Sequence, residues 1–557
     1  MLIHENSKRP NTQIPFTLYK QHNEPMYPCP LKPDAWEKAL EKYSDKTYTK
    51  SLVGMLKYGA LIGYTGSRVG KKIYPNHGSA RLQPDLLLKD LQEQLGNNRL
   101  AVYKEGKLPP FFVSSPIGLV DKNDGSKRRV HDLSYPKGDG VNSGIHGERT
   151  KVVYSTLQDI MNIMKELGAG CFFIKRDFKD AYRHIPISPT DSKLLGFAWE
   201  DEFFEERFLP FGLSSAPFLF NFVAEGFHWI IEQRLKPLKG RVVHYLDDFL
   251  IVLPKGAKWK TAVRIFDETA EELGLRIKTS KNREGEVTDF VGFELDSKRM
   301  VARLASEKLE KTRMLVTKWV DKETISVKEF EHLLGKLDRA SQVVLAGRTN
   351  CRRLIALQEQ CSSSATGNRE NETLKISEEA RRELEWWKNT LPTNPHIKVI
   401  PSNRKTIEVF TNASAFKGMG GYYLKDKQNL ASLPAEQHFM KPHAERNNTR
   451  DKKDPLPKEL LAVEEALTLW GPVFKGFRVV FNASNQGAVH GLVNHAIHDN
   501  GPPLDTLKRI LDLGQKHDVD IWSRWIPQDD NELAVQLSRF DRPRAHALAP
   551  KLGVLGG

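Results

Sequence analysis

The stretch VVHYLDDFLIVL, residues 242–253, places two adjacent carboxylates between two apolar runs. The flanking residues are typical of buried strands, and the polar pair between them is typical of a tight turn. Burying Asp247 and Asp248 side by side is costly unless a cation compensates their charge. An ordinary hairpin turn would carry the same pair without any cation. The stretch therefore predicts a β-hairpin whose tip is either a plain polar turn or a cation site.

A third carboxylate, Asp177, ends the apolar run CFFIKRD, residues 171–177. This run predicts another buried strand, and on its own Asp177 would simply be the end of that strand. Magnesium prefers hard oxygen ligands and keeps coordination positions open for phosphate oxygens. Together with Asp247 and Asp248, Asp177 is therefore a candidate catalytic residue and a candidate ligand of Mg²⁺.

The composition indicates a large folded protein with an anionic partner. The 557 residues leave room for three or four domains, and 39% of them are hydrophobic, enough to bury sizeable cores. Lysine and arginine outnumber the acidic residues by 84 to 70, which gives a net charge of +14. A basic balance of this size favours nucleic acid as the partner, although the charged surface of an ordinary soluble protein would give similar counts.

The cysteines and the apolar runs bear on the compartment. Cys29, Cys171, Cys351 and Cys361 lie far apart and form no CxxC pair, which argues against a disulfide framework or a zinc ribbon. No apolar run approaches the ~18 residues that a membrane span needs, and the N-terminus lacks the apolar core of a secretory signal. We therefore expect an intracellular protein without a membrane partner, in the cytoplasm or the nucleus.

Turn signals and helical spacing predict strands and helices in both halves of the chain. Strands are expected in 111–120, 121–130 and 171–178, and helices at 82–96, 157–167, 218–235, 263–273 and over most of 302–395, with caps such as Ser326 and Thr373. A second strand-rich region begins at Lys405, with strands at 407–414, 420–425 and 477–484 and a helix at 456–470. We expect 360–373 to be a linker and 434–457 to be a long mobile loop.

Five stretches, in this order, resemble the motifs of the reverse transcriptase family. SPIGLVDKNDGSKRRVHDLSYP (115–136) resembles the fingers, RDFKDAY (176–182) the first metal-binding motif, LPFGLSSAP (209–217) the motif that supports template and nucleotide, YLDDF (245–249) the YxDD motif, and FVGFEL (290–295) the primer grip. The resemblance covers about residues 55–540. The wording HDLSYPKGDGVNSGI (131–145) is nearest to polymerases of tyrosine-recombinase, DIRS-like retrotransposons.

This resemblance implies an α+β fold in which a right-hand polymerase is followed by an α/β ribonuclease H-like domain. The implied boundaries are an N-terminal extension at 1–100, fingers and palm at 101–300, a helical thumb or connection at 301–395 and the ribonuclease H-like domain at 400–545. The implied activity is that of a retrotransposon's RNA-directed DNA polymerase, a nucleotidyltransferase that uses two Mg²⁺ ions, for which Mn²⁺ can substitute. Its partners would be an RNA template, a DNA primer, their RNA–DNA hybrid and deoxynucleoside triphosphates, with the oligomeric state unknown.

The resemblance also assigns roles to individual residues. Asp177, Asp247 and Asp248 match the metal ligands, and Tyr182 matches the steric gate against ribonucleotides unless it is a plain core tyrosine. Lys281 matches the general acid that protonates pyrophosphate, or is a surface lysine. The nucleotide-binding set consists of Lys122 and Arg128 (a cationic clamp, or a solvated hairpin tip), Phe178, Asp180 and Ala181 (backbone contacts), Tyr182, and Phe211 and Gly212 (pocket floor). The primer-grip residues are Phe290, Val291, Gly292 and Phe293.

The ribonuclease H-like region departs from its family's pattern of four carboxylates. Only Glu459 keeps an acidic residue, because the other three positions read Asn412, Ser484 and Val535. Asparagine keeps the shape of aspartate without its charge, and valine offers no oxygen. One carboxylate cannot hold a pair of metal ions against their hydration, so we expect a catalytically dead nuclease fold.

Two other functions remain open alongside the active polymerase. One is a decayed or host-adopted copy of a retroelement, since Asp becomes Asn by a single base change. The other is a non-catalytic nucleic-acid-binding protein that uses the same cleft as a clamp. The intact carboxylates argue against the second, because a protein that only binds gains nothing from buried like charges.

Overall fold

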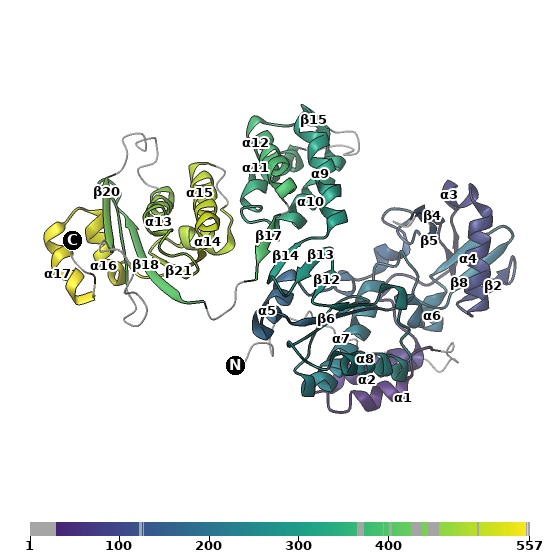
Figure 1. Cartoon of the computed structure of the whole chain (residues 1–557). Helices are drawn as coiled ribbons and strands as arrows, with labels where there is room; N and C mark the ends of the chain where they lie inside the picture. Colours follow the sequence, from purple (N-terminus) through teal and green to yellow (C-terminus); the bar gives the residue numbers. More distant parts are fainter. Residues whose placement is uncertain are drawn as a thin grey trace. The chain divides into compact units, whose positions relative to one another are not determined.

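The computed structural model describes residues 29–121, 125, 127–364, 373–393, 395–399, 404–424, 437–442, 456–497, 501–552 and 554 (Figure 1). The chain forms two compact units, Met1–Val291 and Gly292–Gly557. Both units combine helices with sheets that are largely antiparallel, so the expected α+β class is confirmed.

The predicted hairpin forms one side of a four-stranded sheet in the first unit, with its second strand inside the sheet and its first strand at the edge. Its strands are β9 (Arg241–Tyr245) and β10 (Asp248–Leu253), and the sheet order is β11-β6-β10-β9. The apolar run that ends in Asp177 forms β6 (Phe172–Asp177), which pairs antiparallel with β10, and β11 spans Arg283–Gly285. The hairpin and the buried strand are therefore where the sequence predicts them.

Helices α7 (Ala216–Leu235) and α8 (Trp259–Leu273) pack against this sheet. The contact is largely aromatic, because Phe178, Phe227, Phe249 and Phe266 meet at ring distances between 5.1 and 6.0 Å. Burial of such large rings contributes much of the stability of a core. The C-terminal end of β6 is therefore packed against a buried aromatic core.

The N-terminal helices α1 (Pro33–Ala39) and α2 (Lys46–Tyr58) belong to the same core. The indole of Trp36 is fully buried and donates a hydrogen bond of 3.0 Å to the carbonyl of Leu273, at the end of α8. Helix α5 (Leu157–Leu167) begins at a capping box made by Thr156 and Asp159. Helices α1 and α2 are thus part of the hydrophobic core that supports the sheet of β6, β9 and β10.

A second sheet of the first unit has the order β1-β3-β7-β8-β2, and a separate hairpin pairs β4 with β5. The single strand predicted at 111–120 is wrong, because the structure divides it into β3 and β4 at Pro116, which lacks an N–H donor. Helix α4 packs over these strands. The bounds are β1 Lys71–Ile73, β2 Leu100–Lys104, β3 Phe112–Ser114, β4 Ile117–Asp121, β5 Lys127–His131, β7 Gly196–Trp199, β8 Glu202–Glu206 and α4 Pro84–Gly96.

The second unit opens with a small sheet and a group of helices. Ser326 caps α10 as expected, since its hydroxyl accepts a hydrogen bond from the backbone N–H of Glu329. The cap predicted at Thr373 is wrong, because this residue begins strand β16 and Ser377 caps the helix that follows. The bounds are β13 Phe293–Asp296, β14 Val301–Leu304, β15 Thr324–Ser326, β16 Thr373–Lys375, β17 His396–Lys398, α9 Ser306–Val320, α10 Val327–Ser341, α11 Arg352–Ser364 and α12 Glu378–Thr390.

The rest of the second unit is built on a mixed five-stranded sheet of order β20-β19-β18-β21-β22. Alternate residues of β18 face opposite sides, so Val409 packs with α13 and α15 while Phe410 packs with α16 and α17. The loop predicted at 434–457 is partly wrong, because it contains β20, which pairs with β19. The bounds are β18 Thr406–Ala413, β19 Gly418–Tyr423, β20 His438–Pro442, β21 Arg478–Ala483, β22 Asp520–Trp525, α13 Leu456–Trp470, α14 Gln486–Asn494, α15 Pro502–His517, α16 Glu532–Ser538 and α17 Arg542–Leu548.

Within the described residues, no helix combines the length and the apolar character needed to cross a membrane. Cys29, Cys171 and Cys351 are not joined in disulfides.

Candidate functional site

The three candidate carboxylates meet where β6 and β10 pair. Asp177 and Asp248 are direct cross-strand partners, and Asp248 also pairs with Tyr245 across the hairpin turn. The carbonyl of Asp247 accepts a hydrogen bond of 3.1 Å from the backbone N–H of Phe178, which ties the turn to the residue after β6. The structure therefore brings Asp177 together with Asp247 and Asp248, which lie about seventy positions later in the sequence.

Burial raises the pKa of two of these carboxyls. Asp248 has its pKa raised to about 7 by burial and by the hydrogen bond that it shares with Asp177. Burial, followed by the charge of Asp177, also raises the pKa of Asp247. The Asp248 Oδ1 atom is buried and has no hydrogen-bond partner. An added cation at these oxygens would remove that desolvation cost, so the donor set fits a divalent metal.

One lysine now neutralises part of this charge. The Lys281 ammonium lies 2.5 Å from Asp177 Oδ2, and Asp177 itself is only 2% exposed. Burial would lower the pKa of Lys281, but its hydrogen bond to Asp177 raises it overall. Among the described residues, no three His, Cys, Asp or Glu side chains are oriented so that they could bind one metal ion together. A metal would therefore have to displace Lys281 from Asp177.

A cleft of about 860 Å³ opens beside the carboxylates. It brings Arg128, Phe178, Asp180, Ala181, Tyr182, Phe211 and Lys281 together with Asp177 and Asp247, as the sequence predicts; Lys179, Leu246 and the segment 277–280 complete its lining. Asp248 does not line it, and Lys122 lies outside the described residues. Most of the candidate nucleotide-binding residues therefore share one space with two of the three carboxylates.

Three side chains that line this cleft, Arg128, Phe211 and Tyr182, contact one another. The Arg128 guanidinium lies 4.3 Å from the ring centre of Phe211, and the Tyr182 ring lies 5.2 Å from the same ring. Burial and then the charge of Asp247 raise the pKa of Tyr182 to about 12, so its hydroxyl stays protonated. Gly212 allows a close approach of the backbone, because a Cβ atom there would lie 1.8 Å from the His131 carbonyl oxygen.

The predicted primer-grip residues form a tight turn. Phe290 ends β12 (Val287–Phe290), Phe293 begins β13, and both rings are buried. Between them Val291 and Gly292 adopt positive φ values of 49° and 82°. The division between the two compact units falls inside this turn.

Of the four positions expected to form a degenerate ribonuclease H-like site, Asn412, Glu459 and Ser484 lie together in one hydrogen-bonded network. The Asn412 amide donates to Glu459 Oε1 at 3.2 Å, and its carbonyl oxygen accepts from the Ser538 hydroxyl at 2.9 Å. Ser484 Oγ lies 3.5 Å from the same amide, and Val535 is buried in α16. Burial raises the pKa of Glu459 to about 8, and its Oε2 atom has no partner. No pattern in the sequence indicates Ser538, which contacts Asn412 only in the folded chain.

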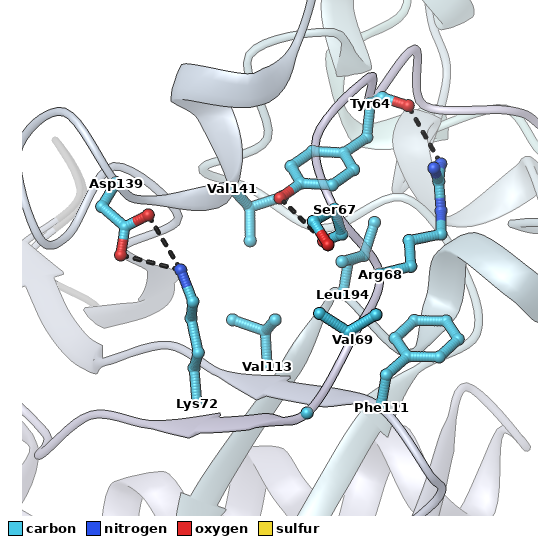
Figure 2. A pocket seen from close by; sticks show the side chains of 11 residues that line it. Tyr64, Ser67, Arg68, Val69, Lys72, Phe111, Val113, Asp139, Val141 and Leu194 are labelled. Atoms are coloured by element: carbon cyan, nitrogen blue, oxygen red, sulfur yellow. Dashed lines mark hydrogen bonds and ion pairs between the residues drawn. The ribbon is translucent and has the colours of Figure 1, made fainter.

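A second, smaller cavity lies in the first unit (Figure 2). Its cations are paired, since Lys72 contacts Asp139 at 2.8 Å and Arg68 contacts Asp191 at 2.8 Å. At about 20 Å³ it has room for little more than one water molecule. It therefore offers no reactive group to a substrate.

Sequence reasoning missed several residues around the cleft. Lys179 and Lys278 line it, while Arg99, His184 and Arg276 surround Asp180 from behind. Arg99 and Arg276 approach Asp180 only through tertiary packing, so no local pattern could have identified these two arginines.

Residues 136–295 match the family model described as "Reverse transcriptase (RNA-dependent DNA polymerase)", so the segment with the three carboxylates is a reverse transcriptase domain. The chain is 26% identical over 236 residues to the Gag-Pro-Pol polyprotein of Mason-Pfizer monkey virus, which covers 40% of this chain and 12% of that protein. It is 25% identical over 221 residues to Protein P of a duck hepatitis B virus, covering 39% and 25%. The chain thus spans a quarter or less of these relatives.

Among solved structures, the chain is similar to the foamy viral protease-reverse transcriptase in complex with double-stranded DNA. That likeness has a TM-score of 0.49 at 17% identity and covers 92% of this chain and 84% of the other.

Proposed function

We propose that this chain is the RNA-directed DNA polymerase of a retrotransposon, which adds deoxynucleotides to a DNA primer on an RNA template. One observation carries the proposal: Asp177 and Asp248 are cross-strand partners, and Asp247 joins them beside the cleft. The net charge of +14 supports a nucleic-acid partner, in which Lys and Arg contact phosphate. The resemblance of 131–145 supports a DIRS-like element.

Asp177, Asp247 and Asp248 would hold two Mg²⁺ ions, with Mn²⁺ as a substitute. When bound, the ions would activate the primer 3′-hydroxyl and neutralise charge on the leaving pyrophosphate. The buried, unpartnered Oδ1 of Asp248 supports this assignment. Lys281, once released from Asp177, would donate its proton to the pyrophosphate; its contact with Asp177 supports this role.

The cleft would bind the incoming deoxynucleoside triphosphate. Arg128, together with Lys122, supplies positive charge for the phosphates, and a guanidinium can bond two phosphate oxygens at once. Tyr182 presents its ring beside Phe211, where a bulky side chain would exclude a ribose 2′-hydroxyl. Asp180 and Ala181 would contact the triphosphate through their backbone amides, and the backbone carbonyl of Phe178 would contribute to binding a metal ion.

The domain assignment follows the same proposal. It is of the right-hand type, with fingers and palm at 101–300, a thumb or connection at 301–395 and a ribonuclease H-like domain at 400–545. We assign no nuclease activity to the last domain. Its support is the neutral network of Asn412, Ser484 and Ser538 around a single, largely buried Glu459.

The test is primer extension on poly(rA)/oligo(dT) with Mg²⁺. The wild-type protein should extend the primer, and Asp247→Asn should lose more than the ~100-fold that removal of an outer-shell metal partner costs. Arg264→Met is the matched control, because this α8 side chain is 68% exposed and does not line the cleft. A wild-type protein that binds the hybrid without extending it would instead be a non-catalytic binder.

A further inference from the structure

One residue of the cleft wall holds an uncommon backbone conformation. Asp180 has φ 53° and ψ 47°, in the left-handed region that side-chain-bearing residues rarely occupy. Such residues persist where the surrounding structure fixes them, and they cluster at functional sites. The backbone of residues 178–181, here called the Asp180 loop, lines the cleft beside Asp177.

Three hydrogen bonds link this loop to Arg276 and His184. The N–H of Lys179 donates to the carbonyl of Arg276 at 2.7 Å. The N–H of Arg276 in turn donates to Nε2 of His184 at 3.1 Å. The other ring nitrogen, Nδ1 of His184, lies 3.1 Å from the carbonyl oxygen of Ala181. The imidazole therefore joins the segment at Arg276 to the Asp180 loop.

These hydrogen bonds require one form of the imidazole. Nε2 must accept a hydrogen bond, so Nδ1 carries the single ring proton and donates a hydrogen bond to the carbonyl oxygen of Ala181. His184 is completely buried, and burial lowers its pKa to about 4, which keeps the ring neutral near pH 7. A side chain with one donor and one acceptor at these places would serve equally well.

Two arginines hold the Asp180 side chain. Arg99 Nη2 lies 3.3 Å from Asp180 Oδ2, and Arg276 Nη2 lies 4.0 Å from the same oxygen. Arg99 is 5% exposed and is itself held by Gln94, whose Oε1 accepts from Arg99 Nη1 at 3.2 Å. A buried arginine that has one carboxylate partner fixes that carboxylate firmly, because losing the pair leaves an uncompensated charge.

We propose that His184, Arg99 and Arg276 are positioning residues that fix the Asp180 loop and so set the affinity for the incoming nucleotide. The inference rests on the proposed polymerase function, in which Asp180 and Ala181 contact the triphosphate through their backbones. None of the three needs to touch the substrate. They act by keeping the loop in its binding conformation before the nucleotide arrives, which reduces the ordering cost of binding.

The first test separates hydrogen bonding from packing at His184. His184→Leu removes both ring hydrogen bonds at similar volume, whereas His184→Gln retains one donor and one acceptor. We expect His184→Leu to raise KM for dTTP about 10-fold, with a smaller change in kcat, because binding is lost more than chemistry. His184→Gln should stay near the wild-type KM. Equal KM values for the two variants would overturn the proposal.

The second test concerns the ion pair. Arg99→Met and Asp180→Asn should each raise KM, and the double variant should be no worse than the single variants, since both remove one interaction. Asparagine tolerates the left-handed conformation, so Asp180→Asn tests the charge alone. Arg264→Met, the exposed control, should leave KM unchanged. Fully additive effects of Arg99→Met and Asp180→Asn would count against the pairing.

Amide hydrogen exchange measures the stability of the Asp180 loop and does not depend on catalytic activity. The backbone amides of residues 178–184 should exchange faster in His184→Leu than in the wild type and should remain protected in His184→Gln. Unchanged protection in His184→Leu would refute the positioning role even if the wild-type protein proved unable to extend a primer. Failure of wild-type extension alone would refute the proposed function and leave the exchange result to decide this inference.

Discussion

Glu459→Gln should stabilise the protein above neutral pH, although it removes the one acidic residue left at the nuclease positions. Glu459 is 3% exposed, and its Oε2 atom has no hydrogen-bond partner. Its nearest polar contacts, the Asn412 amide and Ser484 beyond it, carry no charge. Ionising this carboxyl in the folded state is therefore unfavourable, and glutamine imitates the neutral acid.

The sign and size of the effect follow from the pKa. Burial raises the pKa of Glu459 in the folded protein from its ordinary value of 4.5 to about 8. Between these values the folded state binds more protons than the unfolded state, so stability is greatest below pH 4.5 and falls as pH rises towards 8. At ~1.4 kcal/mol for each pKa unit, the loss is roughly 3 kcal/mol at pH 7 and roughly 5 kcal/mol above pH 8.

Thermal unfolding of the wild type and Glu459→Gln between pH 5 and pH 8.5 measures this difference. At roughly 2–4 °C for each kcal/mol, the variant's transition should lie about 6 °C or more above the wild type at pH 7, and the gap should nearly close at pH 5. A variant that melts below the wild type at pH 8, most of all with Mg²⁺ present, would mean that Glu459 is charged and paired. The account of a dead nuclease site would then be wrong.

The other predictions concern the polymerase cleft. Lys281→Met should lower the melting temperature of the metal-free protein and enlarge the rise caused by Mg²⁺, because Asp177 loses its resident cation. Gly212→Ala should destabilise the fold by ~2 kcal/mol or more on chemical denaturation, since φ is +111° and the added Cβ meets the backbone of His131. Tyr182→Ala should raise ribonucleotide incorporation relative to deoxynucleotide in competition assays; unchanged selectivity would leave Tyr182 a core residue.

The strands that carry the three carboxylates could be predicted because their signals are local. The two apolar runs on either side of Asp247 and Asp248 specify the hairpin directly, and the run before Asp177 specifies its strand. Helix α5 has the bounds expected from its sequence, since Thr156 caps its start and Gly168, at φ 82°, ends it.

The errors and omissions depend on contacts that no local pattern records. β20 was expected to be loop because its flanks are charged, yet Phe439 is buried once the strand pairs with β19. Arg99 meets the Asp180 loop only in the folded chain, and His184, although close to the loop in the sequence, meets Arg276 only there. Ser538 donates a hydrogen bond to the Asn412 side chain, and this contact could not be predicted without the position of Asn412 in the fold.

The most direct measurement compares Mg²⁺-dependent primer extension by the wild type, Asp177→Asn and Glu459→Gln. Both variants exchange one buried carboxylate for an amide, so they differ only in which site is altered. If three converging carboxylates in the first unit drive nucleotide addition, Asp177→Asn is inactive and Glu459→Gln extends the primer as the wild type does. Wild-type extension by Asp177→Asn would contradict the account.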